Sequence, residues 1–274
     1  MGPTFCSRPP WRPRVIRFRL ERDSGKKVAR TIDSLAINAL RVGHAKVVLI
    51  DECFLVHFGL LKVVIALSGA HQVFLYGDRQ QIPFINRVQT FKCNNSEIDG
   101  KRMQIIKKNV SYRCPGDICK RLSEMKDERG NLCYPQGVKK GNPNRPDRSI
   151  EMFKITSEAD VDVRPDDIVL TFTQDEKKKM AEELRKRRLK NMVKTVHEAQ
   201  GKEAGNFCLV RLKMAEDSVF VSTGHNVVAM SRHTGSLRWY CVSRRMTEGI
   251  GLQLKTAMSY SDAVLMGVEH KQCS

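Results

Sequence analysis

The sequence predicts an α/β chain built from parallel sheets in two halves that join near residue 110. Two short apolar, β-branched segments, KVVLID (46–51) and QVFLYGD (72–78), are typical of strands buried on both faces. Residues 57–70 between them have the length of a crossover helix, and Gly69 stands where such a helix would end. A strand, a helix and a second strand in this order form the basic unit of a parallel sheet.

The same pattern returns in the second half. Residues 166–173 (DDIVLTFT) predict a strand, and the charged segment after it carries Asp175 and Glu176 at its start, as expected at a helix N-terminus. Further short apolar segments predict strands at about residues 192–196, 207–212, 225–231 and 237–243. Residues 127–148, rich in Gly, Pro, Asn and Lys, predict a long surface loop.

The chain is strongly basic, with 48 Lys and Arg against 30 Asp and Glu and a formal net charge of +18 at pH 7. This excess favours a polyanionic partner, with nucleic acid as the leading candidate. The charge is spread along the sequence, so basic side chains that only maintain solubility are the alternative. Within this pattern, the run KRRLK (186–190) is interpreted as a solvated helix face.

Several classes of protein are disfavoured by composition. The nine cysteines include no CxxC pair, which favours reduced thiols over a zinc knuckle. No run of about twenty apolar residues predicts a transmembrane segment. Residues 1–27, rich in Arg and Pro without periodicity, predict a disordered basic arm.

Polar residues follow both strands of the first half at the point where each strand ends. Asp51 and Glu52 come directly after the first strand. Gly77, Asp78 and Gln81 follow the second. Ligands of an open α/β sheet lie beyond the carboxyl ends of its strands. Of two adjacent acids at such a place, one can hold Mg²⁺ through water and the other can deprotonate an attacking water. For the acidic pair alone, a helix cap is an equally simple interpretation.

Seven motifs follow one another along the chain: TIDSL, DECFLVHFG, LYGDRQQIPFINR, SYRCP, LTFTQ, TVHEAQGKEAGNFCLVRL and VVAMSRHTGSLRWY. Their order resembles the superfamily 1 RNA helicases of positive-strand RNA viruses, of the type found in tobamoviruses and bromoviruses. The resemblance covers about residues 31–243 and implies two RecA-like parallel-sheet domains, an incomplete first (28–108) and a second (109–274).

The resemblance also implies a function. It implies an RNA helicase and nucleoside triphosphatase that uses ATP, or another nucleoside triphosphate, with Mg²⁺. The implied partners are single-stranded or duplex RNA and other viral replicase domains. The implied location is the host cytoplasm, at the periphery of membrane-bound replication complexes.

For the nucleotide, the resemblance implies that Asp51 holds Mg²⁺, that Glu52 is the general base, and that Gln81 of the GDxxQ motif, with Asp78, contacts the terminal phosphate. The second-half residues implied at the nucleotide are Arg113, Arg232 and Gly201. A planar, permanently charged guanidinium suits the spread charge of a transferring phosphoryl group. Taken singly, each arginine is more typical of a surface salt bridge.

For RNA, the resemblance implies two groups of contacts that bond phosphate and 2′-hydroxyl groups without reading bases. They are Thr31, Asp33 and Ser34 in the first half, and Thr195, His197, Gln200 and Gly201 in the second. For Thr195 and His197, an ordinary strand end is the simpler structural interpretation.

The chain departs from the family at the phosphate-binding loop. No GxxxxGK[ST] precedes TIDSL, and the nearest pair, Gly25 and Lys26, is followed by Lys27 and has Leu20 where a glycine is required. The sequence is therefore interpreted as beginning midway through the first domain, without one central strand and without the main triphosphate grip. Two alternatives to an active enzyme stay open: a non-catalytic module that binds RNA or a replicase partner, and an inactive relic.

Overall fold

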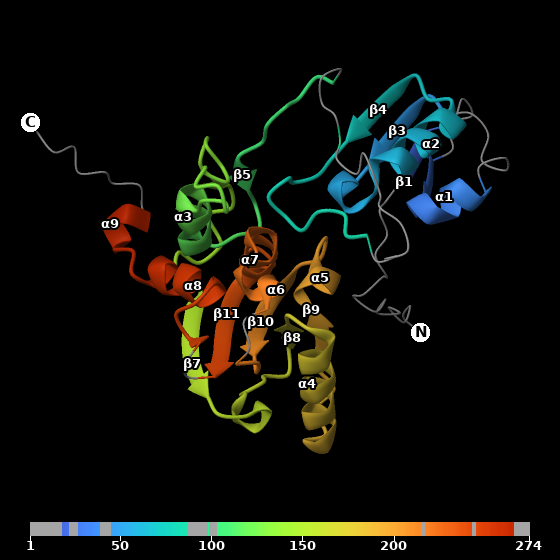
Figure 1. The fold of residues 1–274 in the computed structure, drawn as a ribbon. Helices are drawn as coiled ribbons and strands as arrows, with labels where there is room; N and C mark the ends of the chain where they lie inside the picture. Colours follow the sequence, from blue (N-terminus) through green and yellow to red (C-terminus); the bar gives the residue numbers. More distant parts are fainter. Residues whose placement is uncertain are drawn as a thin grey trace, which may run out of the picture. The chain divides into compact units, whose positions relative to one another are not determined.

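The computed structural model describes residues 18–21, 27–38, 45–86, 98, 103–214, 217–242 and 245–265. The chain divides into two compact units (Figure 1). The first comprises Met1–Arg79 with Pro83–Met103, and the second comprises Gln80–Ile82 with Gln104–Ser274. Both units combine helices with a sheet, so the predicted α/β class is confirmed.

The first unit has a four-stranded sheet in the order β2-β1-β3-β4. The predicted parallel pair is confirmed as β3 (Val47–Ile50) beside β4 (Gln72–Leu75). The crossover helix is α2 (Phe58–Ser68), which ends at Gly69 with a left-handed φ of 59°, as the sequence predicts. Alternate β3 residues, Val48 and Ile50, are fully buried in the core that α2 covers.

The remaining strands of this sheet were not expected. β1 (Phe18–Glu21) pairs antiparallel with both β2 (Lys27–Arg30) and β3, which differs from the prediction of a disordered arm over residues 1–27. The apolar residues of FRLE alternate with polar ones, a strand period that the high Arg and Pro content of the arm obscured. Gly25 and Lys26 lie outside the described residues.

The second unit is organised around a five-stranded sheet in the order β7-β11-β10-β8-β9, with parallel pairing throughout. Four of its strands lie where apolar segments predict them or overlap those segments: β8 (Asp167–Thr171), β9 (Met192–Thr195), β10 (Ala204–Arg211) and β11 (His233–Val242). The predicted charged helix is α4 (Gln174–Lys186), and Met180 and Leu184 of its apolar stripe are buried. β7 (Ile150–Ile155) was not predicted.

One predicted strand is wrong. Residues 225–231 lie mostly in helix α7 (Thr223–Met230), whose last five residues, 226–230, are all buried. A continuous apolar run fits a buried helix as well as a buried strand, so periodicity could not separate the two. The helix N-terminus is fixed by Glu128, whose carboxylate accepts the Thr223 N–H at 2.9 Å.

Short elements complete the described residues, and the predicted loop over 127–148 contains only β6 and turns. No helix among the described residues is both long enough and apolar enough to span a bilayer. The remaining elements are α1 (Ile32–Asn38), η2 (Cys53–Leu55), β5 (Val110–Ser111), α3 (Gly116–Glu124), β6 (Lys139–Lys140), η3 (Glu158–Asp160), α5 (Val196–Ala199), α6 (Ser218–Val221), α8 (Ile250–Met258) and α9 (Asp262–Leu265).

A buried ion pair lies inside the second sheet. Arg238 and Asp167 are each only 1% exposed in their side chains and are hydrogen-bonded to each other. Arg238 also donates to Asp162 Oδ2 and to the Tyr240 hydroxyl, both at 3.1 Å. Its Nη2 also lies 3.3 Å from Cys208 Sγ, so the guanidinium is held by four partners from three strands and a loop, which fixes β8 against β11 across β10.

We predict that Asp167→Asn lowers the free energy of unfolding by about 3–5 kcal/mol, because it leaves the Arg238 charge buried without its main partner. Urea titration followed by circular dichroism measures the change. The matched control is Asp262→Asn, which removes the carboxylate of an exposed pair with Arg148 and should cost less than about 1 kcal/mol. Equal losses in the two variants would contradict this role for the buried pair.

Candidate functional site

In the first unit, the residues after β3 and β4 are brought to one edge of the sheet. The Tyr76 N–H donates to the Ile50 carbonyl oxygen at 2.8 Å, and the Cys53 N–H donates to the Tyr76 carbonyl oxygen at 2.9 Å. These bonds continue the strand pairing beyond Leu75. As a result, the predicted site segments 51–52 and 77–78 lie next to each other.

The acidic pair at this edge has a constrained backbone. Asp51 is exposed, and its Oδ1 accepts the Glu52 N–H at 3.0 Å. Glu52 has a left-handed φ of 51°, which costs free energy for a residue other than glycine. The pair starts the single-turn helix η2, so it occupies a cap position as well as a strand end. Among the described residues, no three His, Cys, Asp or Glu side chains gather into a metal cluster.

Glycine is required beside this pair. A Cβ at Gly77 would lie 2.7 Å from the Phe54 ring and 3.0 Å from Cys53 Sγ. The Arg79 guanidinium lies 5.4 Å from the centre of the same Phe54 ring. The GD segment of the GDxxQ motif is therefore packed tightly against η2.

Gln81, in contrast, belongs to the second unit. The side chain of Gln200 is buried, and its Nε2 donates to the carbonyl oxygen of Ile82 at 3.3 Å. A Cβ at Gly224 would lie 3.1 Å from the Gln81 carbonyl oxygen. The segment Gln80–Ile82 is thus fixed against α5 and the start of α7.

The two predicted arginines contact one turn of the second unit, Arg113 through its side chain and Arg232 through its backbone. Arg113 donates to the Lys202 carbonyl oxygen at 3.5 Å and pairs with Glu203 at 3.6 Å. Arg232 is 1% exposed, and its carbonyl oxygen accepts the Ala204 N–H at 3.3 Å. Gly201, at the start of this turn, has a left-handed φ of 74°. This cluster lies at the amino ends of β10 and β11, not beyond the carboxyl end of a strand.

Thr195 has a structural task in this unit. Its hydroxyl caps α5 by accepting the Glu198 N–H at 3.2 Å, and its side chain is buried. Burial opposes ionisation of Glu198, but hydrogen bonds from Lys177, Gln174 and Thr195 outweigh it and lower the pKa of Glu198 to about 2. His197 lies on the same helical turn and is half-buried. The cap was readable in the sequence as Thr195 and Glu198 at capping-box spacing.

The first-unit residues predicted for RNA lie at a helix start. Thr31 Oγ1 accepts the Ser34 N–H at 3.1 Å, as an N-cap of α1 does. The side chain of Asp33 lies outside the described residues. RNA contacts by Thr31, Asp33 and Ser34 stay predictions.

A buried polar chain next to Arg232 was missed by sequence reasoning. Asp117 Oδ2 accepts the Ser149 N–H at 2.7 Å, and the Ser149 hydroxyl lies 2.9 Å from Asp117 Oδ1. The same hydroxyl is 2.8 Å from His233 Nε2. His233 is fully buried, and burial lowers its pKa to about 3. The three residues are far apart in sequence, so no local spacing could indicate the contact.

Residues 3–241 match the family described as the viral superfamily 1 RNA helicase core domain. The chain belongs to this family.

Viral replication proteins are similar to the chain over most of its length. It is 36% identical over 243 residues to replicase protein 1a of Grapevine leafroll-associated virus 3. This alignment covers 88% of the chain and 11% of that protein. Replication protein 1a of Brome mosaic virus is 34% identical over 78% of the chain and 22% of that protein. The replicase large subunit of Sunn-hemp mosaic virus is 34% identical over 79% of the chain and 13% of that protein. The chain thus spans only a small part of these relatives.

Among solved structures, the helicase nonstructural protein 10 of an arterivirus aligns with a TM-score of 0.45 and 16% identity. The alignment covers 76% of this chain and 41% of that protein.

We predict that His233 makes the protein less stable in mild acid. Its folded-state pKa of about 3 lies below the ordinary 6.5, so between these values the unfolded chain binds the proton that the folded chain rejects. The contribution of neutral His233 to the free energy of unfolding is complete above pH 6.5. It is lost as pH falls below that value, by at most about 1.4 kcal/mol per pH unit. Urea titrations from pH 7 to pH 4 should show a shallower decline for His233→Gln than for the native chain. Parallel declines would contradict the prediction.

Proposed function

We propose that this chain is the nucleoside-triphosphate-dependent RNA helicase core of a viral replication protein. The observation that supports the proposal is that two residues of the family motifs contact the turn of residues 201–204, Arg113 through its guanidinium and Arg232 through its carbonyl oxygen. The Arg113 guanidinium beside this turn can offer charge to a phosphate. The Arg232 guanidinium is buried and donates to the Ser231 hydroxyl at 2.9 Å, so its proposed contact with phosphate requires that this side chain become exposed. Family membership adds the expectation that this phosphate belongs to a nucleotide or to RNA.

For the nucleotide, we propose ligands in each unit, taken separately. Asp51 has an exposed carboxylate, which fits Mg²⁺ because this ion keeps its waters and takes one or two carboxylates with substrate phosphates. When bound, Mg²⁺ neutralises phosphate charge. Glu52 is proposed as the base for the attacking water, and Gln81, Arg113 and Arg232 as phosphate contacts. Asp78 is proposed to support the same edge of the sheet, since it follows Tyr76, which pairs with Ile50 and Cys53.

For RNA, we propose contacts from α5 and the turn after it, through His197, Gln200 and Gly201. The Gln200 side chain is buried and donates to the Ile82 carbonyl oxygen. We therefore propose that Gln200 affects RNA binding indirectly, by fixing the position of the segment Gln80–Ile82. Thr195, buried as the cap of α5, is proposed to act by holding the helix.

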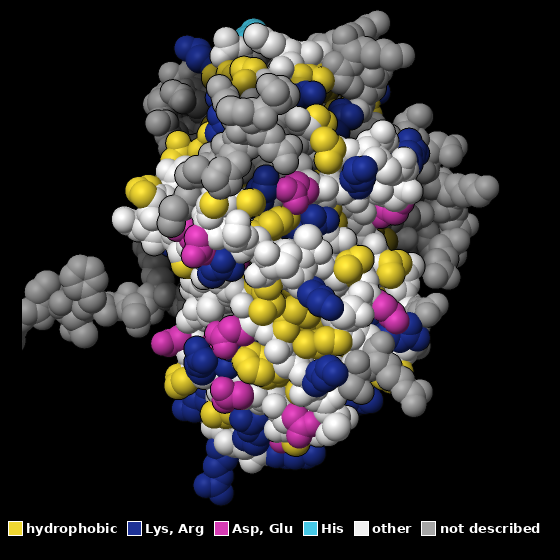
Figure 2. Space-filling view, turned by 90° about the vertical axis from the view of Figure 1, so that its left-hand side faces the viewer, with side chains coloured by type: hydrophobic (Ala, Val, Ile, Leu, Met, Phe, Trp, Pro, Cys, Tyr) yellow, Lys and Arg dark blue, Asp and Glu magenta, His cyan; other side chains and the backbone are white. Residues whose placement is uncertain are grey.

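Surface charge alone does not mark the path of the RNA. Figure 2 shows Lys and Arg side chains scattered over one face among acidic and hydrophobic ones. The proposal therefore depends on the specific side chains at α5 and the turn, and less on the net charge of +18.

A second candidate function is a non-catalytic module that holds RNA or another replicase domain. Residues 1–30 contain no GxxxxGK[ST] sequence, the loop that grips a triphosphate in enzymes of this class. We propose that either activity serves RNA replication in the host cell, since the similar proteins are replicase proteins.

RNA-stimulated ATP hydrolysis by the purified chain tests the first function. We expect turnover that rises with single-stranded RNA and falls at least about 100-fold in Glu52→Gln, the range for loss of a general base. Glu182→Gln on the exposed side of α4 is the matched control and should leave turnover unchanged. A folded chain that binds RNA but shows no turnover would support the second function.

A further inference from the structure

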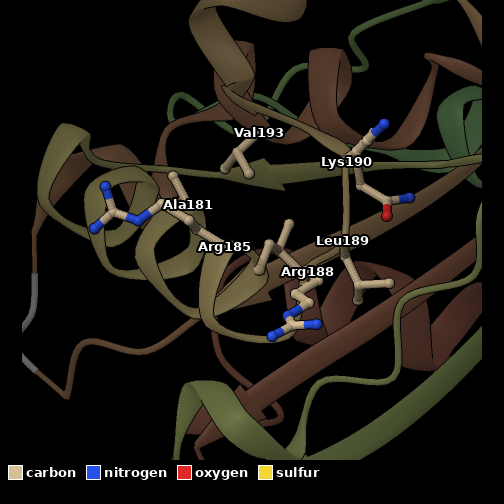
Figure 3. Close-up of a pocket in the computed structure, with 8 residues that line it drawn as sticks. Ala181, Arg185, Arg188, Leu189, Lys190 and Val193 are labelled. Carbon is tan, nitrogen blue, oxygen red and sulfur yellow. The ribbon is translucent and has the colours of Figure 1, made fainter.

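A hollow of about 440 Å³ opens where α4 ends and β9 begins (Figure 3). Its inner surface is aliphatic, formed by Ala181 and Leu184 of α4 with Leu189 and Val193. Leu184 belongs to the buried core between α4 and the sheet, so the hollow reaches down to that core. None of the residues proposed for the nucleotide or RNA lines it.

The margin of the hollow is positively charged. The charged ends of Arg185, Arg188 and Lys190 lie around it, directed outward in Figure 3. No carboxylate is among the lining residues, and no acidic side chain in the described part of the chain pairs with these three. The helix dipole accounts for a cation in the last turn of α4, such as Arg185, but not for Lys190 beyond it.

The segment that carries these cations is held in place. Arg188 has a left-handed φ of 58°, unusual for a side chain of this size. Beside it, Arg187 Nη1 donates to the Val161 carbonyl oxygen at 2.7 Å. Asn191 Nδ2 donates to the carbonyl oxygen of Asp167, the first residue of β8, at 3.0 Å, and to two carbonyl oxygens of the loop before it. A hollow that is already formed loses little conformational entropy when a ligand binds.

The lining indicates what kind of ligand fits. Single-stranded nucleic acid is usually held by stacking its bases on aromatic rings, and no aromatic side chain lines this hollow. An aliphatic floor inside a ring of cations instead matches an aliphatic side chain flanked by carboxylates. We propose that the hollow docks an acidic peptide segment of a partner protein, with a Leu or Ile side chain seated on Ala181 and Val193. This inference goes beyond the proposed helicase function and does not depend on it.

The probe for the test is a fluorescein-labelled peptide of about twelve residues made of Glu-Asp-Leu repeats, a length that spans such a hollow. Its binding to the full chain is measured by fluorescence anisotropy. We expect Arg185→Glu with Lys190→Glu to weaken binding about tenfold. The matched control is Lys178→Glu with Lys179→Glu, which makes the same charge change at exposed positions of the same helix and should alter affinity little.

A third variant separates shape from charge. Ala181→Arg adds a positive charge but fills the aliphatic inner surface of the hollow. It should therefore weaken binding of the peptide, whereas it should strengthen binding of any ligand held by charge alone. A peptide with Ser in place of Leu should bind worse to the native chain. The proposal is overturned if the native chain does not bind the probe, if rim and control variants behave alike, or if Ala181→Arg tightens binding. It is also overturned if an oligouridylate displaces the peptide and the rim variants weaken both equally, since the hollow would then be a phosphate site.

Discussion

Parallel strand pairing is the constraint on which the arrangement of the candidate residues in each unit depends. In the first unit, the register of β3 and β4 places the ends of both strands together, which brings the acids after β3 to the GD segment after β4. In the second unit, the pairing of Ala204 with His233 brings the turn after α5 beside Arg232. A one-residue slip in either pair would send these side chains to the other face of the sheet.

Buried polar groups fix this arrangement and limit how it can vary. The Arg238–Asp167 pair spans the sheet that carries the turn, and the chain from Asp117 through Ser149 to His233 anchors the residue after Arg232. Removing water from such groups is costly unless each finds a partner, so the contacts favour one arrangement of the strands over near alternatives. The position of Arg232 is therefore set by groups that need not touch a ligand.

The sequence predicted those features that depend on neighbours along the chain. β3, α2, β4 and α4 were found because their apolar periods, helix starts and Gly69 are local signals. α7 was mistaken for a strand because its apolar run, VVAM (227–230), is too short to show a period. β7 was missed because IEMFKI interrupts its apolar residues with charges. The site residues were named from motif resemblance, but their contacts could not be. The bond from Gln200 to Ile82 joins residues 118 positions apart, and such a contact exists only once the sheet is built.

The proposed RNA-binding surface of the second unit consists of α5 and the turn after it. The most direct test measures the affinity of the full chain for a fluorescein-labelled oligouridylate over a range of salt concentrations. We expect binding at low salt that weakens steeply as salt is added, since each phosphate contact contributes about −0.7 to the slope of log affinity against log salt concentration. We also expect His197→Ala to lower the affinity for RNA, whereas Lys178→Ala at an exposed position of α4 is the control. No binding at low salt, or equal affinities for the two variants, would contradict the proposed RNA-binding surface.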